Sequence, residues 1–300
     1  MPVVPVPYDA KNTPKIEFAE YNGARFKTVE WPVPEGVEYK GKVVYVHGFA
    51  EEANVYTEFF DNLSNAGYEV FFFEQRGAGE GSPGKLRGRT DEFHTFDDLD
   101  HFIKQQLDKR TDKSEKFYLG GHSMGGGIVL NYGIRGTYKD DIKGYFACGP
   151  LIRLHPKSQP NIILNTLAPF AAKVLPNFQI DSKLNYDYIT SSPRWKKYIE
   201  DSSPKLIGTT RQFNDMFERG KHLLDPEYAN KFKFPLLIVH GTEDYINDIA
   251  GSEEFYNSLK DKTGKKFVRV EKGRHSLFVE VESIYQDVLN QLLEFLAENK

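Results

Sequence analysis

The stretch Gly120-Gly121-His122-Ser123-Met124-Gly125-Gly126 decides the fold of this chain, because it places a Gly-x-Ser-x-Gly pentapeptide between a strand and a helix. The apolar run 117–119 precedes it, and residues 128–132 follow with a helical pattern. A serine at such a turn is held in strained backbone geometry, with its hydroxyl exposed above the sheet. The pentapeptide alone also fits a glycine-rich turn with a structural serine. Ser123 is therefore a candidate nucleophile that needs partners elsewhere in the chain.

Short apolar runs recur along the sequence, at 43–46, 70–73, 145–147, 236–239 and 267–270. Continuous runs of this kind are typical of strands buried on both faces of a parallel sheet. Amphipathic helical patterns separate them, at 54–66, 96–107, 251–259 and 279–296. Near the start, Asn22-Gly23 predicts a type I′ hairpin turn within 16–31. The alternation predicts a doubly wound α/β domain, a mostly parallel sheet flanked by helices.

The alternation of strands and helices breaks between about Leu151 and Asp225, where the pattern is helical, irregular and rich in proline. Ligand chemistry in α/β sheets lies at the carboxyl ends of the strands. We interpret the break as an inserted helical cap over that end. The predicted organisation is a core from 1–150, a cap from 151–226, and the second part of the core from 227–300.

Composition restricts the classes of function. The chain has 300 residues, 39% of them hydrophobic, and a net charge of -4 without a basic stripe, which argues against a nucleic-acid partner. The chain has a single cysteine, Cys148, which excludes a disulfide framework within the chain. We expect Cys148 to be a buried side chain of a protein in a reducing compartment. No metal-ligand cluster or cofactor motif is present, so no metal and no cofactor are expected. The glycine-rich run 77–81 is interpreted as a loop.

No run approaches the roughly 18 apolar residues of a membrane span, and residues 1–7 lack the basic and apolar regions of a signal peptide. We expect a cytoplasmic protein that could bind a membrane surface without crossing it.

A serine nucleophile needs a base, and the base needs an acid that orients it. His275 follows the predicted strand 267–270, and Asp244 follows the predicted strand 236–239. The order Ser123, Asp244, His275 is the order expected of an α/β-hydrolase. Because each residue lies just past a strand end, the three are predicted to share one cleft.

Other acids and histidines fit structural roles better. Asp248 is interpreted as a carboxylate at the start of the next helix. His240 is expected to be packed at its strand end, and His122 to turn away from Ser123. His47 is assigned to the loop after the first buried strand, which would also supply part of an oxyanion hole. The predicted donors to that hole are the backbone N–H groups of Phe49 and Met124.

Together these segments resemble the fungal monoglyceride lipases of the α/β-hydrolase superfamily, and the resemblance covers nearly the whole chain. The matching segments are His47-Gly48-Phe49-Ala50-Glu51, Gln75-Arg76-Gly77-Ala78-Gly79, Ser82-Pro83-Gly84, Gly121-His122-Ser123-Met124-Gly125-Gly126-Gly127, Gly149-Pro150-Leu151, His240-Gly241-Thr242-Glu243-Asp244 and Gly273-Arg274-His275-Ser276. The resemblance implies hydrolysis of monoacylglycerols to glycerol and fatty acid, at a lipid droplet or membrane surface to which the protein is peripherally bound.

The resemblance also implies a polar, glycerol-recognising end of the site, to which Glu51 belongs. Two positions depart from the family pattern. The segment Asn54-Val55-Tyr56 lacks the arginine that often precedes the tyrosine, and Phe278 replaces a second histidine three residues past the catalytic one. Head-group choice is therefore less firmly indicated than ester hydrolysis.

The start of the cap, from 162 to 175, is apolar on nearly all sides and is interrupted by Pro169. This surface either packs on the core or forms an acyl-chain tunnel whose outer face contacts lipid. The residues predicted to contact the acyl chain are Ile163, Leu167, Phe170 and Leu175.

Two alternative functions remain open. The same triad would serve a broader carboxylesterase or lysophospholipase with a different pocket. A protein of another class, a catalytically silent lipid-binding α/β-hydrolase module, would usually lack one triad member. A peptidase is less favoured, and an epoxide hydrolase would need aspartate at position 123.

Overall fold

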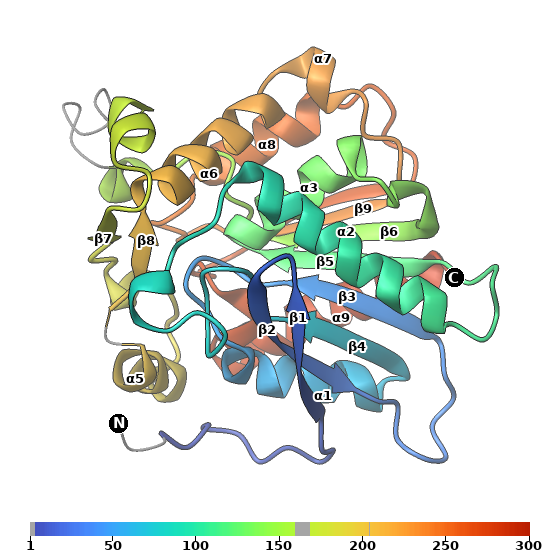
Figure 1. Ribbon diagram of the computed structural model, residues 1–300. Coiled ribbons are helices and arrows are strands. Elements are labelled where there is room, and N and C mark those ends of the chain that lie inside the picture. The colour runs from blue at the N-terminus through green and yellow to red at the C-terminus, as the bar shows by residue number, and fades with distance from the viewer. Residues whose placement is uncertain (1–3, 160–168, 204) are drawn as a thin grey trace.

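The computed structural model describes residues 4–159, 169–203 and 205–300, and its centre is an eight-stranded sheet (Figure 1). The strand order is β1-β2-β4-β3-β5-β6-β9-β10. The pairs β1/β2 and β2/β4 are antiparallel and all others are parallel. The strands are β1 (Lys15–Tyr21), β2 (Ala24–Trp31), β3 (Gly41–Val46), β4 (Tyr68–Phe73), β5 (Phe117–His122), β6 (Ile142–Cys148), β9 (Leu236–Gly241) and β10 (Lys265–Val270).

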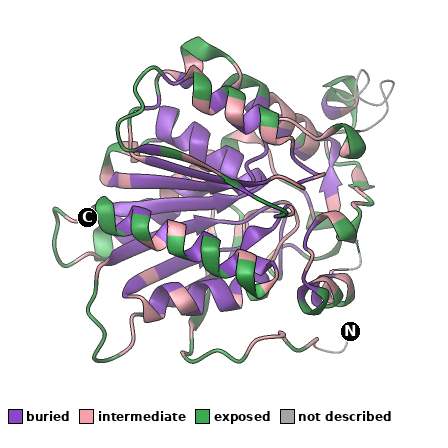
Figure 2. Cartoon of the chain, turned by 180° about the vertical axis from the view of Figure 1, so that it is seen from behind, coloured by how far each residue is buried: buried purple, intermediate pink, exposed green. Residues whose placement is uncertain are grey.

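Helices cover both faces of this sheet. One hydrophobic cluster joins the sheet to α1 (Thr57–Asn65) and α9 (Glu282–Glu298), and the other joins it to α2 (Glu92–Lys109), α3 (Met124–Arg135) and α8 (Ile249–Ser258). Figure 2 shows the inner strands buried, while α9 is buried only along the side that faces the sheet. The predicted α/β-hydrolase architecture is confirmed.

The predicted strands and the hairpin are confirmed at their expected places. Asn22 and Gly23 have φ values of 43° and 72°, the left-handed conformations that a type I′ turn requires.

Two predicted helices begin later than their sequence pattern indicates. Residues Ala53–Tyr56 form a 3-10 turn, η1, before α1 begins at Thr57. Residues Leu277–Val279 form another, η6, and α9 begins only at Glu282. Glu280 interrupts the second pattern in extended backbone (φ −84°, ψ −179°), because its carboxylate accepts hydrogen bonds from backbone groups outside the helix.

The chain between β6 and β9 forms a group of elements that extends from the left side to the top of Figure 1. They are helical residues 169–174, the strand pair β7 (Gln179–Asp181) and β8 (Ile207–Thr209), the 3-10 turn η5 (Tyr186–Tyr188), and the helices α5 (Pro193–Ser202), α6 (Thr210–Leu223) and α7 (Pro226–Ala229). The cap boundaries at 151 and 226 stay a prediction, and Ile163 and Leu167 lie outside the described residues.

The group is anchored to the core at several points. The Thr209 hydroxyl donates to the carbonyl of Gly88 at 2.7 Å, and Trp195 Nε1 donates to Glu58 on α1 at 3.1 Å. The cap therefore contacts both the loop between β4 and α2 and the helix that follows β3.

Glycines bring α3 against the sheet directly after Ser123. A Cβ atom on Gly125 would lie 2.0 Å from the carbonyl oxygen of Val46 at the end of β3. That atom is backbone and cannot turn aside as a flexible side chain can. The first turn of α3 is therefore fixed by backbone contact.

Gly125→Ala is expected to lower the melting temperature strongly, because Cβ would displace β3 or α3 and overpacking of this kind costs about 1–3 kcal/mol or more. Gly251→Ala is the matched control, since it also lies near a helix start and its Cβ would meet atoms no closer than 3.2 Å. Thermal unfolding of both variants tests the constraint, and equal melting temperatures would contradict it.

Candidate active site

Ser123 lies on the turn between β5 and α3 in a strained conformation, with φ 52° and ψ −116°. Its backbone N–H donates to the carbonyl of Cys148 at 2.9 Å, and its carbonyl accepts the N–H groups of Gly127 and Leu151 at 3.0 and 2.8 Å. A non-glycine residue holds such backbone angles only where its surroundings determine them. The turn predicted from the pentapeptide is therefore present, with Ser123 at its tip.

His275 and Asp244 form a buried pair beside this turn. His275 Nδ1 lies 2.8 Å from Asp244 Oδ2. The other carboxylate oxygen, Oδ1, accepts the backbone N–H groups of Ile246 and Asn247 at 2.8 and 2.9 Å. His240 Nε2 lies 3.1 Å from Asp244 Oδ2, so this histidine is packed as expected and also supports the acid. The carboxylate is held in the orientation needed to fix the tautomer of His275.

Burial and charge act against each other in this pair. Burial lowers the pKa of His275 and outweighs the raising effect of Asp244. Burial alone would raise the pKa of Asp244, but the charge and hydrogen bonds of His275 and His240 hold it well below its ordinary value. At neutral pH the pair is therefore a carboxylate beside a neutral imidazole, which is the state that a general base requires.

Asn247 lies between the acid and the nucleophile, and sequence analysis did not identify it. Its Nδ2 donates to the carbonyl of Gly149 at 2.7 Å and to Ser123 Oγ at 3.5 Å. Among the described residues, Ser123 Oγ makes no direct hydrogen bond to His275. Catalytic hydrogen bonds are often long without substrate and shorten in the complex. Position 247 belongs to no local motif, so no sequence signal marked it.

The two predicted oxyanion-hole donors fit their role. Met124 is the first residue of α3, and Phe49 lies in the loop after β3. Within the described ranges, neither backbone N–H donates to a protein acceptor. The Phe49 ring packs on Phe213 of α6, with ring centroids 5.0 Å apart, so this loop also contacts the cap.

Glu51 joins that loop to the histidine of the elbow. Its carboxylate accepts the N–H of Gly48 at 2.6 Å and the hydroxyl of Tyr56, and lies 3.0 Å from His122 Nδ1. Burial would raise the pKa of Glu51, but His122 and Tyr56 lower it to about 2, and Glu51 in turn raises the pKa of His122 despite burial. The His122 ring makes its hydrogen bonds to Glu51, Tyr56 and the His275 loop, and among the described residues none to Ser123.

His47 and Asp248 have structural contacts. His47 Nε2 accepts the N–H of Gln75 at 2.8 Å, which ties the loop after β3 to the loop after β4. Asp248 caps α8 by accepting the N–H of Ala250 at 3.0 Å. Both interpretations are confirmed.

The two positions that depart from the family pattern belong to the core. Phe278 is 3% exposed and stacks on Phe59 with ring centroids 3.8 Å apart, and Val55 is buried in the same hydrophobic cluster. These side chains do not present polar groups to a substrate.

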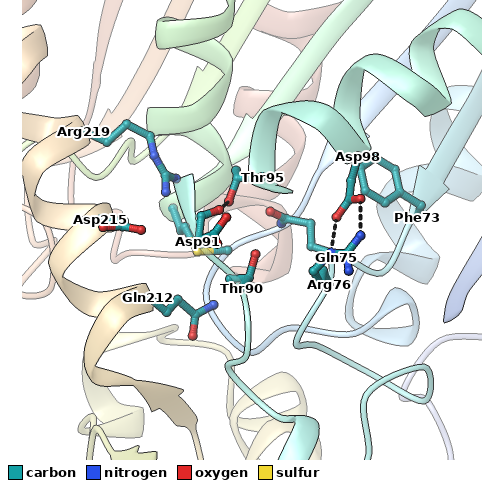
Figure 3. A pocket seen from close by; sticks show the side chains of 11 residues that line it. Phe73, Gln75, Arg76, Thr90, Asp91, Thr95, Asp98, Gln212, Asp215 and Arg219 are labelled. Carbon is teal, nitrogen blue, oxygen red and sulfur yellow. Dashed lines mark hydrogen bonds and ion pairs between the residues drawn. The ribbon is translucent and has the colours of Figure 1, made fainter. Parts of the chain in front are cut away.

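A small polar cavity lies next to the elbow, between α2 and α6 (Figure 3). Met124, Gln212 and Arg219 line it, and Arg76 forms a two-fold hydrogen-bonded ion pair with Asp98 on its wall. It encloses about 10 Å³, which is room for a single water molecule. The buried Gln212 Oε1 has no hydrogen-bond partner among the described residues. The cavity is too small for an acyl chain or glycerol.

The fold and the Ser123, His275 and Asp244 arrangement define a serine hydrolase of the α/β-hydrolase class. A model of the Hydrolase_4 family, described as serine aminopeptidase S33, matches residues 37–282. The monoglyceride lipase of Saccharomyces cerevisiae is 38% identical, over 99% of this chain and 98% of its own length.

Solved structures agree with this assignment. The crystal structure of a soluble variant of the Saccharomyces cerevisiae monoglyceride lipase, in complex with a substrate analog, has a TM-score of 0.93 and covers 99% of both chains at 38% identity. The monoacylglycerol lipase of Paleococcus ferrophilus has a TM-score of 0.76 at 26% identity, covering 92% of this chain and 99% of its own. The chain therefore belongs to the Hydrolase_4 family and, within it, to the monoglyceride lipases.

We expect kcat/KM for a water-soluble ester to rise with pH to a plateau, with its midpoint below 6.5, the ordinary pKa of histidine. The reason is that the base must be neutral and burial lowers the pKa of His275. Asp244→Asn should lower the plateau by about 10⁴-fold, since the tautomer is no longer fixed. A midpoint above 6.5 in the parent would contradict this account.

Proposed function

We propose that this protein hydrolyses monoacylglycerols to glycerol and fatty acid through an acyl-enzyme on Ser123. The observation that carries the proposal is the buried His275–Asp244 pair beside a strained serine, in a chain whose full length matches monoglyceride lipases. A silent lipid-binding module would not need the complete triad.

The chemistry follows from the positions of these groups. His275 accepts the proton of Ser123 as Oγ attacks the ester carbonyl, and Asp244 stabilises the imidazolium that forms. The N–H groups of Phe49 and Met124 hold the oxyanion. His275 then protonates the departing glycerol, and a water activated by the same histidine releases the fatty acid.

Head-group recognition is proposed to centre on Glu51. Its side chain is 17% exposed, and we propose that its carboxylate accepts a substrate hydroxyl in addition to the protein donors that it already binds. Because Val55 and Phe278 are buried in the core, they add no polar contact. A broader carboxylesterase or lysophospholipase remains the second candidate, favoured by this reduced set of polar groups.

Purified protein should hydrolyse 1-oleoylglycerol faster than dioleoylglycerol, triolein or lysophosphatidylcholine. Ser123→Ala should lose this activity by at least about a thousandfold, because the nucleophile is removed. Release of oleate measures each rate. Equal turnover of lysophosphatidylcholine would favour the broader carboxylesterase or lysophospholipase. Activity of Ser123→Ala within tenfold of the parent would show that Ser123 is not the nucleophile.

The cap carries exposed apolar side chains between residues 170 and 180, and we propose that together they form a patch that contacts a lipid surface. The patch comprises Phe170, Val174, Leu175, Phe178 and Ile180, whose exposed fractions are 67%, 58%, 57%, 59% and 38%. Phe170 and Leu175, predicted to contact the acyl chain, thus fit the lipid-facing side of that prediction better than the wall of a tunnel. No helix in the described ranges is long and apolar enough to cross a membrane. An exposed patch of this kind is typical of an interaction surface.

The double variant Phe170→Ser, Phe178→Ser should reduce hydrolysis of vesicle-borne 1-oleoylglycerol by about tenfold or more, because two exposed aromatic side chains no longer enter the lipid. Hydrolysis of a water-soluble ester should stay unchanged. Phe93→Ser on α2 is the matched control, since Phe93 is 66% exposed outside the cap. Equal losses in both variants would exclude the patch as the contact surface.

A further inference from the structure

Glu280 is a buried carboxylate next to the catalytic histidine, and the mechanism above does not use it. It is 1% exposed, and its partners are N–H and O–H groups rather than a cation. Its oxygens accept the N–H of Arg274 at 3.0 Å, the N–H of Val281 at 3.0 Å, and both the N–H and the hydroxyl of Ser191. A buried carboxylate needs such donors, because burial without hydrogen bonds is costly.

These donors come from two parts of the chain that are distant in sequence. Arg274 directly precedes His275 in the loop after β10, whereas Ser191 lies in the cap between η5 and α5. Glu280 therefore joins the loop of the catalytic base to the cap. We call the cap residues involved, 187–192, the clamp segment.

Further hydrogen bonds run along the same contact. The N–H of His275 donates to the carbonyl of Tyr188 at 3.3 Å, and the N–H of Ser276 donates to the carbonyl of Ile189 at 2.8 Å. The Thr190 hydroxyl donates to the carbonyl of Val279 at 2.7 Å. The backbone of the histidine loop thus makes successive hydrogen bonds to the clamp segment.

The core also holds this loop, through the N–H of Glu243, which donates to the carbonyl of Gly273 at 2.9 Å, and through His122. His122 Nε2 lies 3.2 Å from the carbonyl oxygen of His275 and 3.3 Å from the hydroxyl of Ser276. The position of the His275 backbone therefore depends on core and cap together. Two charged groups lie at their junction: Glu280, and the guanidinium of Arg274, which donates to the carbonyls of Asp187 and Thr190 at 2.6 and 3.1 Å.

We propose that Glu280 is a positioning residue that links the His275 loop to the clamp segment through hydrogen bonds. His275 is then placed beside Ser123 only when the cap is packed on the core. The proposal rests on the proposed function, in which His275 is the general base. A misplacement of about 1 Å is enough to lower a catalytic rate strongly.

The test compares Glu280→Gln, Ser191→Ala and the control Ser192→Ala, with kcat and KM measured on a water-soluble ester so that lipid binding plays no part. Ser192 is the neighbouring buried serine, and its hydroxyl does not contact Glu280. We expect kcat to fall about tenfold in Glu280→Gln and about threefold in Ser191→Ala at nearly constant KM. Ser192→Ala should keep the parent kcat.

The pH profile separates positioning from loss of stability. The charged or titratable groups that act on His275 are Asp244, His122 and Glu51. Asp244 raises the pKa of His275, so a loosened ring should move the acid limb of kcat to lower pH in Glu280→Gln and Ser191→Ala. If Glu280 and Ser191 had a purely structural role, the variants would have a lower melting temperature, but the acid limb of their kcat profile would stay at the pH of the parent.

His275→Ala on the same ester distinguishes the two proposals. If His275→Ala is active, the proposed function fails. If it is inactive while Glu280→Gln and Ser191→Ala keep the parent kcat and acid limb, only the positioning role of Glu280 is overturned. If Glu280→Gln fails to fold, the test is the comparison of kcat between Ser191→Ala and Ser192→Ala. Equal kcat values in those two variants would reject the proposal.

Discussion

The strained backbone at Ser123 is the constraint on which the rest of the structure depends. A positive φ at a serine is held only because the turn is bonded to the end of β6 and because glycines let α3 approach β3 at backbone distance. The sheet and α3 must both be in place before the hydroxyl can project at the strand ends. The close packing of the core therefore serves the placement of one side chain.

Around that turn, ionisable groups are buried in complementary pairs. Asp244 stabilises His275, and Glu51 stabilises His122, whose ring centroid lies 4.7 Å from that of His275. Each carboxylate also accepts backbone N–H groups, which makes its burial tolerable. The second pair holds the loop of Phe49 to the elbow, so the proposed oxyanion hole and the proposed base share one hydrogen-bonded network.

The cap takes part in this network rather than only covering it. Phe213 packs on Phe49, and the clamp segment is bonded to the loop of His275. The cap also exposes the apolar side chains of Phe170, Val174, Leu175, Phe178 and Ile180. A single insertion thus contacts the proposed oxyanion loop and the loop of the proposed base, and it also carries exposed apolar side chains.

The sequence by itself determined the strands, the elbow and the order of Ser123, Asp244 and His275, because each is marked by residues that are neighbours in the chain. It also placed the hairpin at Asn22-Gly23 correctly, since turn chemistry is local. It could not determine whether Ser123 and His275 face one another, nor where α9 begins, because the start of that helix depends on the remote partners of Glu280.

Only the tertiary structure decided the groups that pair across long sequence separations. Asn247 contacts Ser123 across 124 positions, and Ser191 contacts Glu280 across 89. Likewise, Val55 and Phe278 are core residues, and Phe170 and Leu175 are exposed, although all four are simply apolar in the sequence. Apolar character predicts a preference for burial but not which surface will cover a side chain, and that depends on how separate elements pack together.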